Sequence, residues 1–411
     1  MRHDPRARMT LRYLTTTLIA LCCSLGAAAQ LLNGSPTISL LTCAPGPEIY
    51  SLEGHSGLRI ADADGDVVAN WGLFDFDSPG FVYRFVKGET DYSVGLFPTQ
   101  LFVEVYRREG RRVVEQQLNL TPEQARRVKE LVMRNLSPEE RVYRYNYVKD
   151  NCATRPLRLV ERAVGADSIT LAPALADLQP GLTFRKAMRH YHKSYPWYQF
   201  GIDLALGSGI DYELARHETA FAPVALEEMM AAAVIHTSGG DIPLVKATRV
   251  LVDAAPDAAV CPPTPFWLSP VAVFWLLAAA TLLITLRDLR RGRLTARFDL
   301  IFYGLLGLTG CVLTFLIFIS VHEATSPNYL YLWINPLCLF IAAAALLRRQ
   351  PQWAAWLQLF NILGIAGYIG IAAFGIQAIN AAFVPLMLSD IMRAAARLLT
   401  AYRGYNQNIK Q

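Results

Sequence analysis

Hydrophobic and polar positions divide the chain into parts with different patterns. Residues 18–25 are largely apolar and follow an arginine-bearing start, whereas the next 235 or so residues mix apolar and polar positions and contain turn signals. From residue 266 onward, long apolar runs follow one another almost to the C-terminus. We therefore predict four segments: a signal peptide (1–29), an exported domain large enough to bury its own core (30–265), a helical membrane domain (266–400) and a tail (401–411).

The first 29 residues have the layout of a cleavable secretory signal peptide. Arginines precede the apolar stretch, and three alanines at residues 27–29 follow it. Cys22 and Cys23 lie inside this segment after residues that do not suit a lipid-attached cysteine, so we expect both to leave with the signal peptide.

Five apolar runs after residue 265 approach the length needed to cross a hydrocarbon layer of about 30 Å. Their polar ends include His322, Glu323, Asn328 and Asn335, which could be solvated or could help to recognise a lipoprotein or a lipid headgroup. The last two runs meet at Gly375 and could instead form one kinked helix with an interfacial piece. The runs are residues 266–286, 300–321, 330–347, 353–373 and 376–396.

Basic loops orient these runs, because short loops rich in lysine and arginine stay in the cytoplasm. Residues 287–297 and 347–352 are such loops, which places the exported domain on the outer side and the tail inside. We therefore predict a multi-pass protein of the bacterial inner membrane with a periplasmic domain. The formal net charge of +5 is explained by the basic loops and the leader, so it does not indicate nucleic-acid binding.

Three cysteines remain in the exported domain: Cys43, Cys152 and Cys261. Cys43 and Cys261 could form a disulfide in an oxidising compartment, although spacing alone does not establish one. Cys152 would then be a free thiol. Cys311 and Cys338 lie in predicted membrane helices, where packing explains them.

Cys152 lies where a helix is predicted to begin. Leu157, Val160 and Val164 follow at helical spacing, and Gly165 suits the C-terminal cap. Either Asn151 or Asp150 could cap the start. The positive end of a helix favours a thiolate, which is the reactive form of cysteine.

His55 is the histidine best placed to assist this thiol. It begins one of two strand-like stretches, HSGLRIAD and VVANWG, which flank the hairpin-like turn DADGD. Its small neighbours leave the ring accessible. A buried inert cysteine and a histidine that satisfies a turn are the competing interpretation, but a strand histidine and a helix-start cysteine are the two halves of a thiol dyad.

Four sequence blocks carry a resemblance to a known family. They are ISLLTCAPGPEIYSLEGHSGLRI, NWGLFDFDSPGFVYRFVKGETDYSVG, QQLNLTPEQ and YRYNYVKDNCATRP, which together span residues 38–156. In this order they resemble the exported domain of the Lnb-type lipoprotein N-acyltransferases. HEATSPNYLYLWINPL resembles the outward loop that precedes a span in the same proteins.

The resemblance implies an α+β exported domain with a permuted papain-like thiol fold, similar to the NlpC-like and lecithin:retinol acyltransferase groups. Cys152 and His55 match the nucleophile and its base. An acyl chain would pass from a phospholipid to Cys152 as a thioester, and then to the N-terminal amine of a diacylated lipoprotein. Asn70 or Asp75 would orient the imidazole, although both residue types are common in turns. We expect neither a cofactor nor a metal.

Two other functions remain open from the sequence. The same dyad could serve a hydrolase, either a phospholipase or a cell-wall amidase or endopeptidase, because the fold supports all of these. A wall hydrolase has no evident need for five spans. The chain could also be an assembly or transport subunit with a structural Cys152, but no conspicuous charged pathway runs through the spans.

Overall fold

The computed structural model describes residues 35–409 apart from residues 64, 166–167, 176–179, 255–262 and 348–350, and it describes side chains up to residue 400. The expected signal peptide and Cys261 lie outside these described residues. The described chain forms two compact units. The sheet unit contains residues 35–82, 89–180 and 214–254, and the helical unit contains residues 83–88, 181–213 and 263–409.

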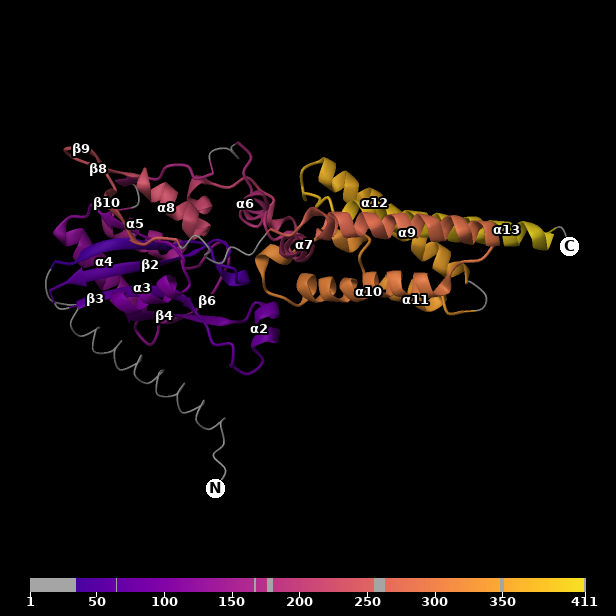
Figure 1. The fold of residues 1–411 in the computed structure, drawn as a ribbon, viewed down its shortest axis with the longest axis horizontal. Coiled ribbons are helices and arrows are strands. Elements are labelled where there is room, and N and C mark those ends of the chain that lie inside the picture. The colour runs from indigo at the N-terminus through magenta and orange to yellow at the C-terminus, as the bar shows by residue number, and fades with distance from the viewer. Residues whose placement is uncertain are drawn as a thin grey trace, which may run out of the picture. The chain divides into compact units, whose positions relative to one another are not determined.

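A seven-stranded antiparallel sheet forms the centre of the sheet unit, in the order β10-β5-β1-β2-β3-β4-β6 (Figure 1). Its hairpin of β2 and β3 pairs Asp62 with Gly65, which confirms the hairpin predicted from the sequence. The strands are β1 (Thr37–Cys43), β2 (His55–Asp62), β3 (Gly65–Leu73), β4 (Asp91–Pro98), β5 (Val113–Leu118), β6 (Val142–Arg144) and β10 (Val245–Val252).

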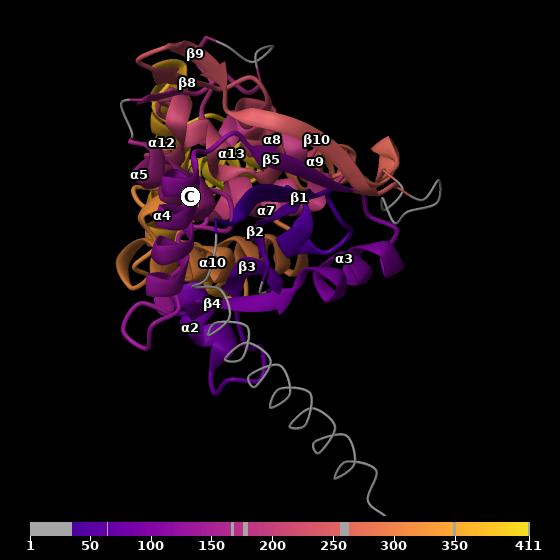
Figure 2. The ribbon, with the colours of Figure 1, turned by 90° about the vertical axis from the view of Figure 1, so that its left-hand side faces the viewer.

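Helices pack on the sheet and bury its apolar positions. The helix α3 (Thr99–Arg108) packs Phe102 and Val103 against Leu41 and Val68, and it lies on the opposite side of the sheet from α4 in Figure 2. The other elements of this unit are η1 (Ile49–Ser51), α4 (Pro122–Asn135), α5 (Thr154–Val164), η5 (Arg216–Phe221), α8 (Pro223–Ala231) and the small sheet of β7 (Ile169–Thr170), β8 (Val234–Thr237) and β9 (Gly240–Pro243).

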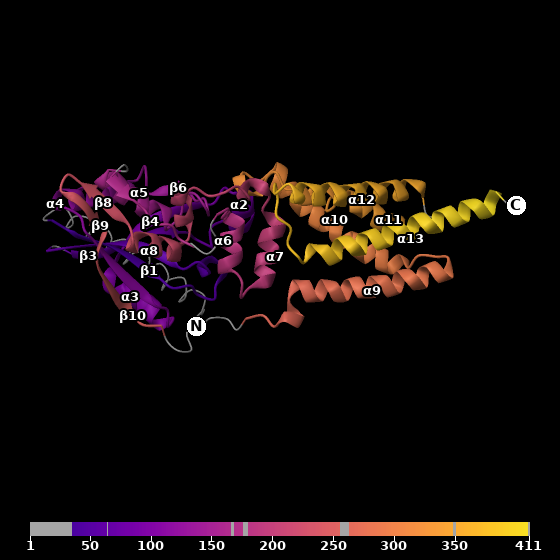
Figure 3. The same cartoon turned by 90° about the horizontal axis from the view of Figure 1, so that it is seen from above.

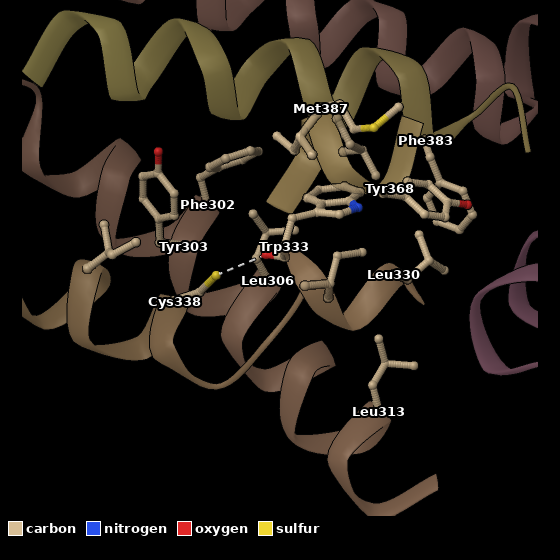
Figure 4. Packing of buried hydrophobic residues seen from close by; sticks show 14 of the residues in the cluster. Phe302, Tyr303, Leu306, Leu313, Leu330, Trp333, Cys338, Tyr368, Phe383 and Met387 are labelled. Atoms are coloured by element: carbon tan, nitrogen blue, oxygen red, sulfur yellow. Dashed lines mark hydrogen bonds between the residues drawn. The ribbon is translucent and has the colours of Figure 1, made fainter. Parts of the chain in front are cut away.

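The helical unit has a core that collects around Trp333, which is fully buried among Phe302, Leu306 and Tyr368 (Figure 4). The helix α13 packs along α9 and against α12 (Figure 3). The helices are α6 (Phe184–Tyr191), α7 (Pro196–Ala205), α9 (Pro270–Arg291), α10 (Ala296–Phe318), α11 (Leu337–Ala344), α12 (Gln352–Ala373) and α13 (Phe383–Ile409), with the 3-10 turns η4 (Ser208–Ile210), η6 (Phe266–Leu268), η7 (Glu323–Thr325) and η8 (Tyr329–Leu332).

Within the described residues, α9, α10 and α12 are each long and apolar enough to cross a membrane. The expected continuous helix over 330–347 is absent from the described residues. The chain instead forms η8, an irregular turn and then the short α11. Pro336 cannot donate a helical hydrogen bond, and the Asn335 side chain accepts from the backbone N–H of Leu337 to begin α11. Of the four polar residues considered at the ends of the runs, Asn328 and Asn335 are buried, each 4% exposed, whereas Glu323 is exposed.

The last two apolar runs form separate helices. The helix α12 ends at Ala373, Gly375 adopts a left-handed φ of 72°, and α13 begins only at Phe383. It continues to Ile409, so the expected tail is helical through that residue. The alternative of one kinked helix is therefore wrong.

Buried ion pairs tie helices of this unit together. On α13, Arg393 contacts Asp299 of α10 at 2.7 Å and Asp288 of α9 at 3.0 Å. Arg185 of α6 contacts Asp203 of α7 at 2.7 Å, and its guanidinium also pairs with Asp211. Each of these charges is buried, so loss of one partner would leave an uncompensated charge.

Candidate active site

A glycine turn sets the position of His55. Gly54 has a φ of +84°, which side chains other than glycine rarely adopt, and a Cβ atom there would lie 2.5 Å from the carbonyl oxygen of Cys43. The next residue enters β2, where His55 pairs with Cys43 across the strands. The close approach of the two backbones therefore requires glycine directly before the histidine.

The imidazole of His55 has a polar partner on the neighbouring strand. Its Nε2 lies 2.7 Å from Oδ1 of Asn70 on β3. Because an amide oxygen only accepts hydrogen bonds, Nε2 carries the proton and Nδ1 is the basic nitrogen of the neutral ring. Phe102 and Tyr106 of α3 stand beside the ring, with centroids 6.4 and 6.5 Å away.

Burial keeps His55 neutral. It lowers the pKa of the ring to about 4, the hydrogen bond to Asn70 raises it in part, and the positive charge of Arg111 lowers it further. At neutral pH the ring is therefore uncharged, and its Nδ1 is free to accept a proton.

Cys152 lies just before α5, as the sequence predicts. Oδ1 of Asn151 accepts from the backbone N–H groups of Ala153 and Thr154 at 2.9 and 3.0 Å, so Asn151 caps the start of the helix. Its amide nitrogen also donates to the carbonyls of Tyr147 and Phe221. These four hydrogen bonds fix the turn that carries the thiol.

The thiol of Cys152 is protonated at neutral pH. Burial raises its pKa to about 11, the backbone N–H groups of Ser56 and Cys152 lower it in part, and the charge of Glu53 raises it. The side chain is 9% exposed. Thiol and imidazole are thus both neutral in the free protein, and deprotonation of the sulfur must accompany its attack.

Ser56 links His55 and Cys152, the two residues predicted to form the dyad. It follows His55 in β2, and its Oγ donates to the backbone carbonyl of Cys152 at 2.8 Å. The backbone N–H of Ser56 also lowers the pKa of the thiol. Within the described residues no hydrogen bond joins the sulfur directly to the imidazole.

The two residues expected to orient the imidazole lie in different places. Asn70 contacts the ring, whereas Asp75 is exposed and its Oδ1 accepts from the backbone N–H of Asp77 in a turn. Asp150, an alternative cap, binds Arg155 and Arg158 instead.

Two charged residues near the site were missed by the sequence reasoning. Glu53 is 6% exposed, accepts a short hydrogen bond from the Tyr147 hydroxyl and raises the pKa of Cys152. Arg111 is 8% exposed, donates from Nε to the Ala44 carbonyl and lies 4.8 Å from the Tyr106 ring centre. The position of Glu53 two residues before the histidine was the only signal available.

Cys43 is a free, buried thiol opposite His55, and burial raises its pKa. The disulfide considered for Cys43 involves Cys261, which lies outside the described part of the chain. Within that part, no cluster of three histidine, cysteine or acidic residues could hold a metal ion.

An antiparallel sheet domain in which Ser56, the residue after a strand histidine, binds a helix-start cysteine, followed by long apolar helices, describes a membrane protein with a polar domain outside the bilayer. Residues 28–186 match the model of the Lnb N-terminal periplasmic domain, and residues 263–404 match that of the Lnb transmembrane domain. The chain therefore belongs to the Lnb family of membrane-associated enzymes of lipoprotein maturation. No match was found among curated proteins or solved structures.

Proposed function

We propose that this protein is a lipoprotein N-acyltransferase of the inner membrane, with its sheet unit in the periplasm as a permuted papain-like thiol enzyme. Cys152 takes an acyl chain from a phospholipid and passes it to the N-terminal amine of a diacylated lipoprotein. One observation supports this most strongly: Ser56, the residue after His55, donates from Oγ to the backbone carbonyl of Cys152, and Asn70 holds the His55 ring in one tautomer.

The first half-reaction moves the acyl group onto the sulfur. Nδ1 of His55 accepts the thiol proton while the sulfur of Cys152 attacks the ester carbonyl of the phospholipid. The ester C–O bond then breaks, and the lysophospholipid alcohol leaves with the proton from the imidazolium. The backbone N–H groups of Ser56 and Cys152, which lower the pKa of the thiol, would donate to the oxyanion.

The second half-reaction forms the amide. The unprotonated N-terminal amine of the lipoprotein attacks the thioester carbonyl, and its proton passes to Nδ1 of His55. The C–S bond breaks, the imidazolium returns the proton to the sulfur of Cys152, and the free thiol is restored. The thioester keeps the transfer potential of the ester while one substrate leaves and the other enters.

The shifted pKa values of His55 and Cys152 support proton transfer during the attack rather than a thiolate–imidazolium ion pair in the free protein. An imidazole with a pKa of about 4 and a thiol with a pKa of about 11 remain uncharged together over a wide pH range. A resting thiolate would react with many electrophiles, whereas this pair becomes reactive when a carbonyl accepts the sulfur.

Membrane attachment supports the choice of substrates. Both the phospholipid and the diacylated acceptor are anchored in the bilayer, and the long apolar helices α9, α10 and α12 hold the enzyme at the same surface. Confinement to one surface raises the effective concentration of each substrate.

Acylation of a defined acceptor tests the proposal. Membranes that contain the full-length protein are incubated with a diacylated lipoprotein, and the mass of its N-terminal peptide is measured. We expect a gain of one acyl chain, which Cys152→Ser and His55→Ala abolish. The matched controls Cys311→Ser and His236→Ala alter an exposed cysteine and an exposed histidine outside the site and should retain it. Undiminished product from the dyad variants would refute the proposal, and lipid cleavage without an acylated amine would favour a phospholipase.

A further inference from the structure

A continuous row of aromatic rings runs through the sheet unit beside the candidate active site. We call it the aromatic row. Adjacent ring centroids lie 4.3 to 6.4 Å apart, within the range of direct aromatic packing. Its members in order are Tyr50, Phe76, Phe74, Tyr92 and Tyr145, and Phe81 packs on Phe74 and Phe76 at the side of the row.

The outer end of the row is exposed. Tyr50 is 64% exposed and Phe76 is 61% exposed, and Ile49 beside Tyr50 is 62% exposed. Phe74 contacts both outer rings, at 6.2 Å from Tyr50 and 4.5 Å from Phe76. Large apolar side chains gathered at an exposed site commonly mark a place where an apolar partner binds.

The inner end of the row lies near Cys152. Tyr92 stacks on Tyr145 at 4.3 Å, and Gly72 lies next to both Tyr145 and Cys152. A Cβ atom at Gly72 would lie 3.7 Å from Cε2 of Tyr145 and 4.0 Å from Cβ of Cys152. Because Gly72, at a bulge of β3, has no side chain, it places no Cβ atom next to Tyr145 and Cys152.

The row changes from exposed to buried along its length. Phe81 is 8% exposed and Tyr92 is 7% exposed, and burial raises the pKa of Tyr92 to about 12. No ring in the row carries a charge at neutral pH. A long, flexible and uncharged ligand therefore matches this surface better than a peptide or a headgroup does.

We propose that the aromatic row is the binding site for the fatty acyl chain of the donor lipid, and that it leads the carbonyl end of that chain to Cys152. The inference rests on the proposed acyl transfer. Two observations favour this occupant. The last ring of the row and Cys152 both border Gly72. The same chain also carries helices apolar enough to place it at a bilayer, which supplies such chains. The row thereby selects for long acyl chains.

Photolabelling tests the site without relying on turnover. Full-length Cys152→Ala protein in membranes is irradiated with phosphatidylglycerol that carries a diazirine in its acyl chain. We expect label on peptides that contain Tyr50 and residues 74–81, and a several-fold loss of this label in Phe76→Ala. Leu101→Ala is the matched control, because Leu101 is an equally exposed apolar residue outside the row. Label distributed over Leu101 as strongly as over the row would overturn the inference.

Chain-length preference provides the second measurement. With p-nitrophenyl esters, Tyr50→Ala and Phe76→Ala should lower the ratio of decanoate to acetate kcat/KM by about tenfold, because each removes apolar contact with the long chain only. An unchanged ratio in both variants contradicts the inference. If the row is labelled but no thioester forms on Cys152, the row remains an acyl-chain site and the acyl-transfer function is the part that fails.

Discussion

The imidazole of His55 donates from Nε2 to Oδ1 of Asn70 on the neighbouring strand, at 2.7 Å. This bond holds the ring in the tautomer whose Nδ1 is free to take a proton. It also places the third polar group of the site on β3, two residues before the Gly72 bulge that borders Cys152.

Replacement of Asn70 should weaken proton transfer. Asn70→Ala removes the acceptor for Nε2–H, so we expect kcat to fall by roughly tenfold or more while the fold is retained. Asn70→Asp places a carboxylate there, which raises the pKa of His55 and moves the acid limb of the pH–rate profile to higher pH. Equal profiles for wild type and Asn70→Asp would show that the residue does not act through the imidazole.

The pH dependence follows from the two shifted pKa values. The rate of the first half-reaction, acylation of Cys152, should fall on the acid side only near pH 4, where His55 takes up a proton, and should stay level through neutrality because the thiol pKa is about 11. Arg111→Gln removes a charge that lowers the His55 pKa, so the acid limb should move upward. A limb fixed near pH 6.5 in both proteins would indicate an unperturbed imidazole.

Glu53 should control thiol reactivity. After burial, its negative charge is the remaining influence that raises the Cys152 pKa, so Glu53→Gln should lower that pKa. Alkylation of Cys152 by iodoacetamide at a fixed pH near 8 should then be faster than in wild type. Glu130→Gln, an exposed carboxylate on α4, is the control. A slower reaction in Glu53→Gln would mean that its contact with Tyr147 matters more for access than for charge.

Replacement of Gly54 should destabilise the fold because of its backbone conformation. An alanine there meets the Cys43 carbonyl and the strained φ of +84°, so Gly54→Ala should cost about 1–3 kcal/mol of folding free energy and displace His55. Gly65→Ala is the matched control in the same hairpin, since a Cβ at Gly65 meets nothing within 4 Å. Thermal unfolding of both variants compares them, and equal melting temperatures would contradict the role given to Gly54.

Local patterns predicted several elements correctly. The β2–β3 hairpin and the position of Cys152 before α5 both depend on short-range signals. Neighbouring residues determine such turns and caps, so a single sequence contains the necessary information.

Features that depend on distant packing were not predictable. Glu53 and Arg111 become parts of the site only because β1, β2 and the segment after α3 meet in space. The buried turn at residues 329–336 has an apolar composition that resembles a membrane span. Its place is set by close backbone approach, since a Cβ at Gly310 would lie 2.3 Å from the backbone carbon of Asn335.

Residues 83–87 show the limit of short patterns. An alternation of aromatic and basic side chains, such as that of Tyr83, Arg84 and Phe85, favours a strand, but the structure has the helix α2 (Phe81–Lys87). Five residues are too few to distinguish a period of two from a period of 3.6 when packing decides the outcome.

The acyl state of Cys152 tests the central claim most directly. Full-length protein in its membrane is digested without reducing agents, and the peptide that contains Cys152 is weighed before and after treatment with neutral hydroxylamine. We predict a hydroxylamine-sensitive acyl mass on Cys152 that disappears in His55→Ala and decreases when a diacylated lipoprotein is added. A Cys152 peptide that never carries an acyl group, while lipoprotein N-acylation continues, would contradict the assignment of the nucleophile.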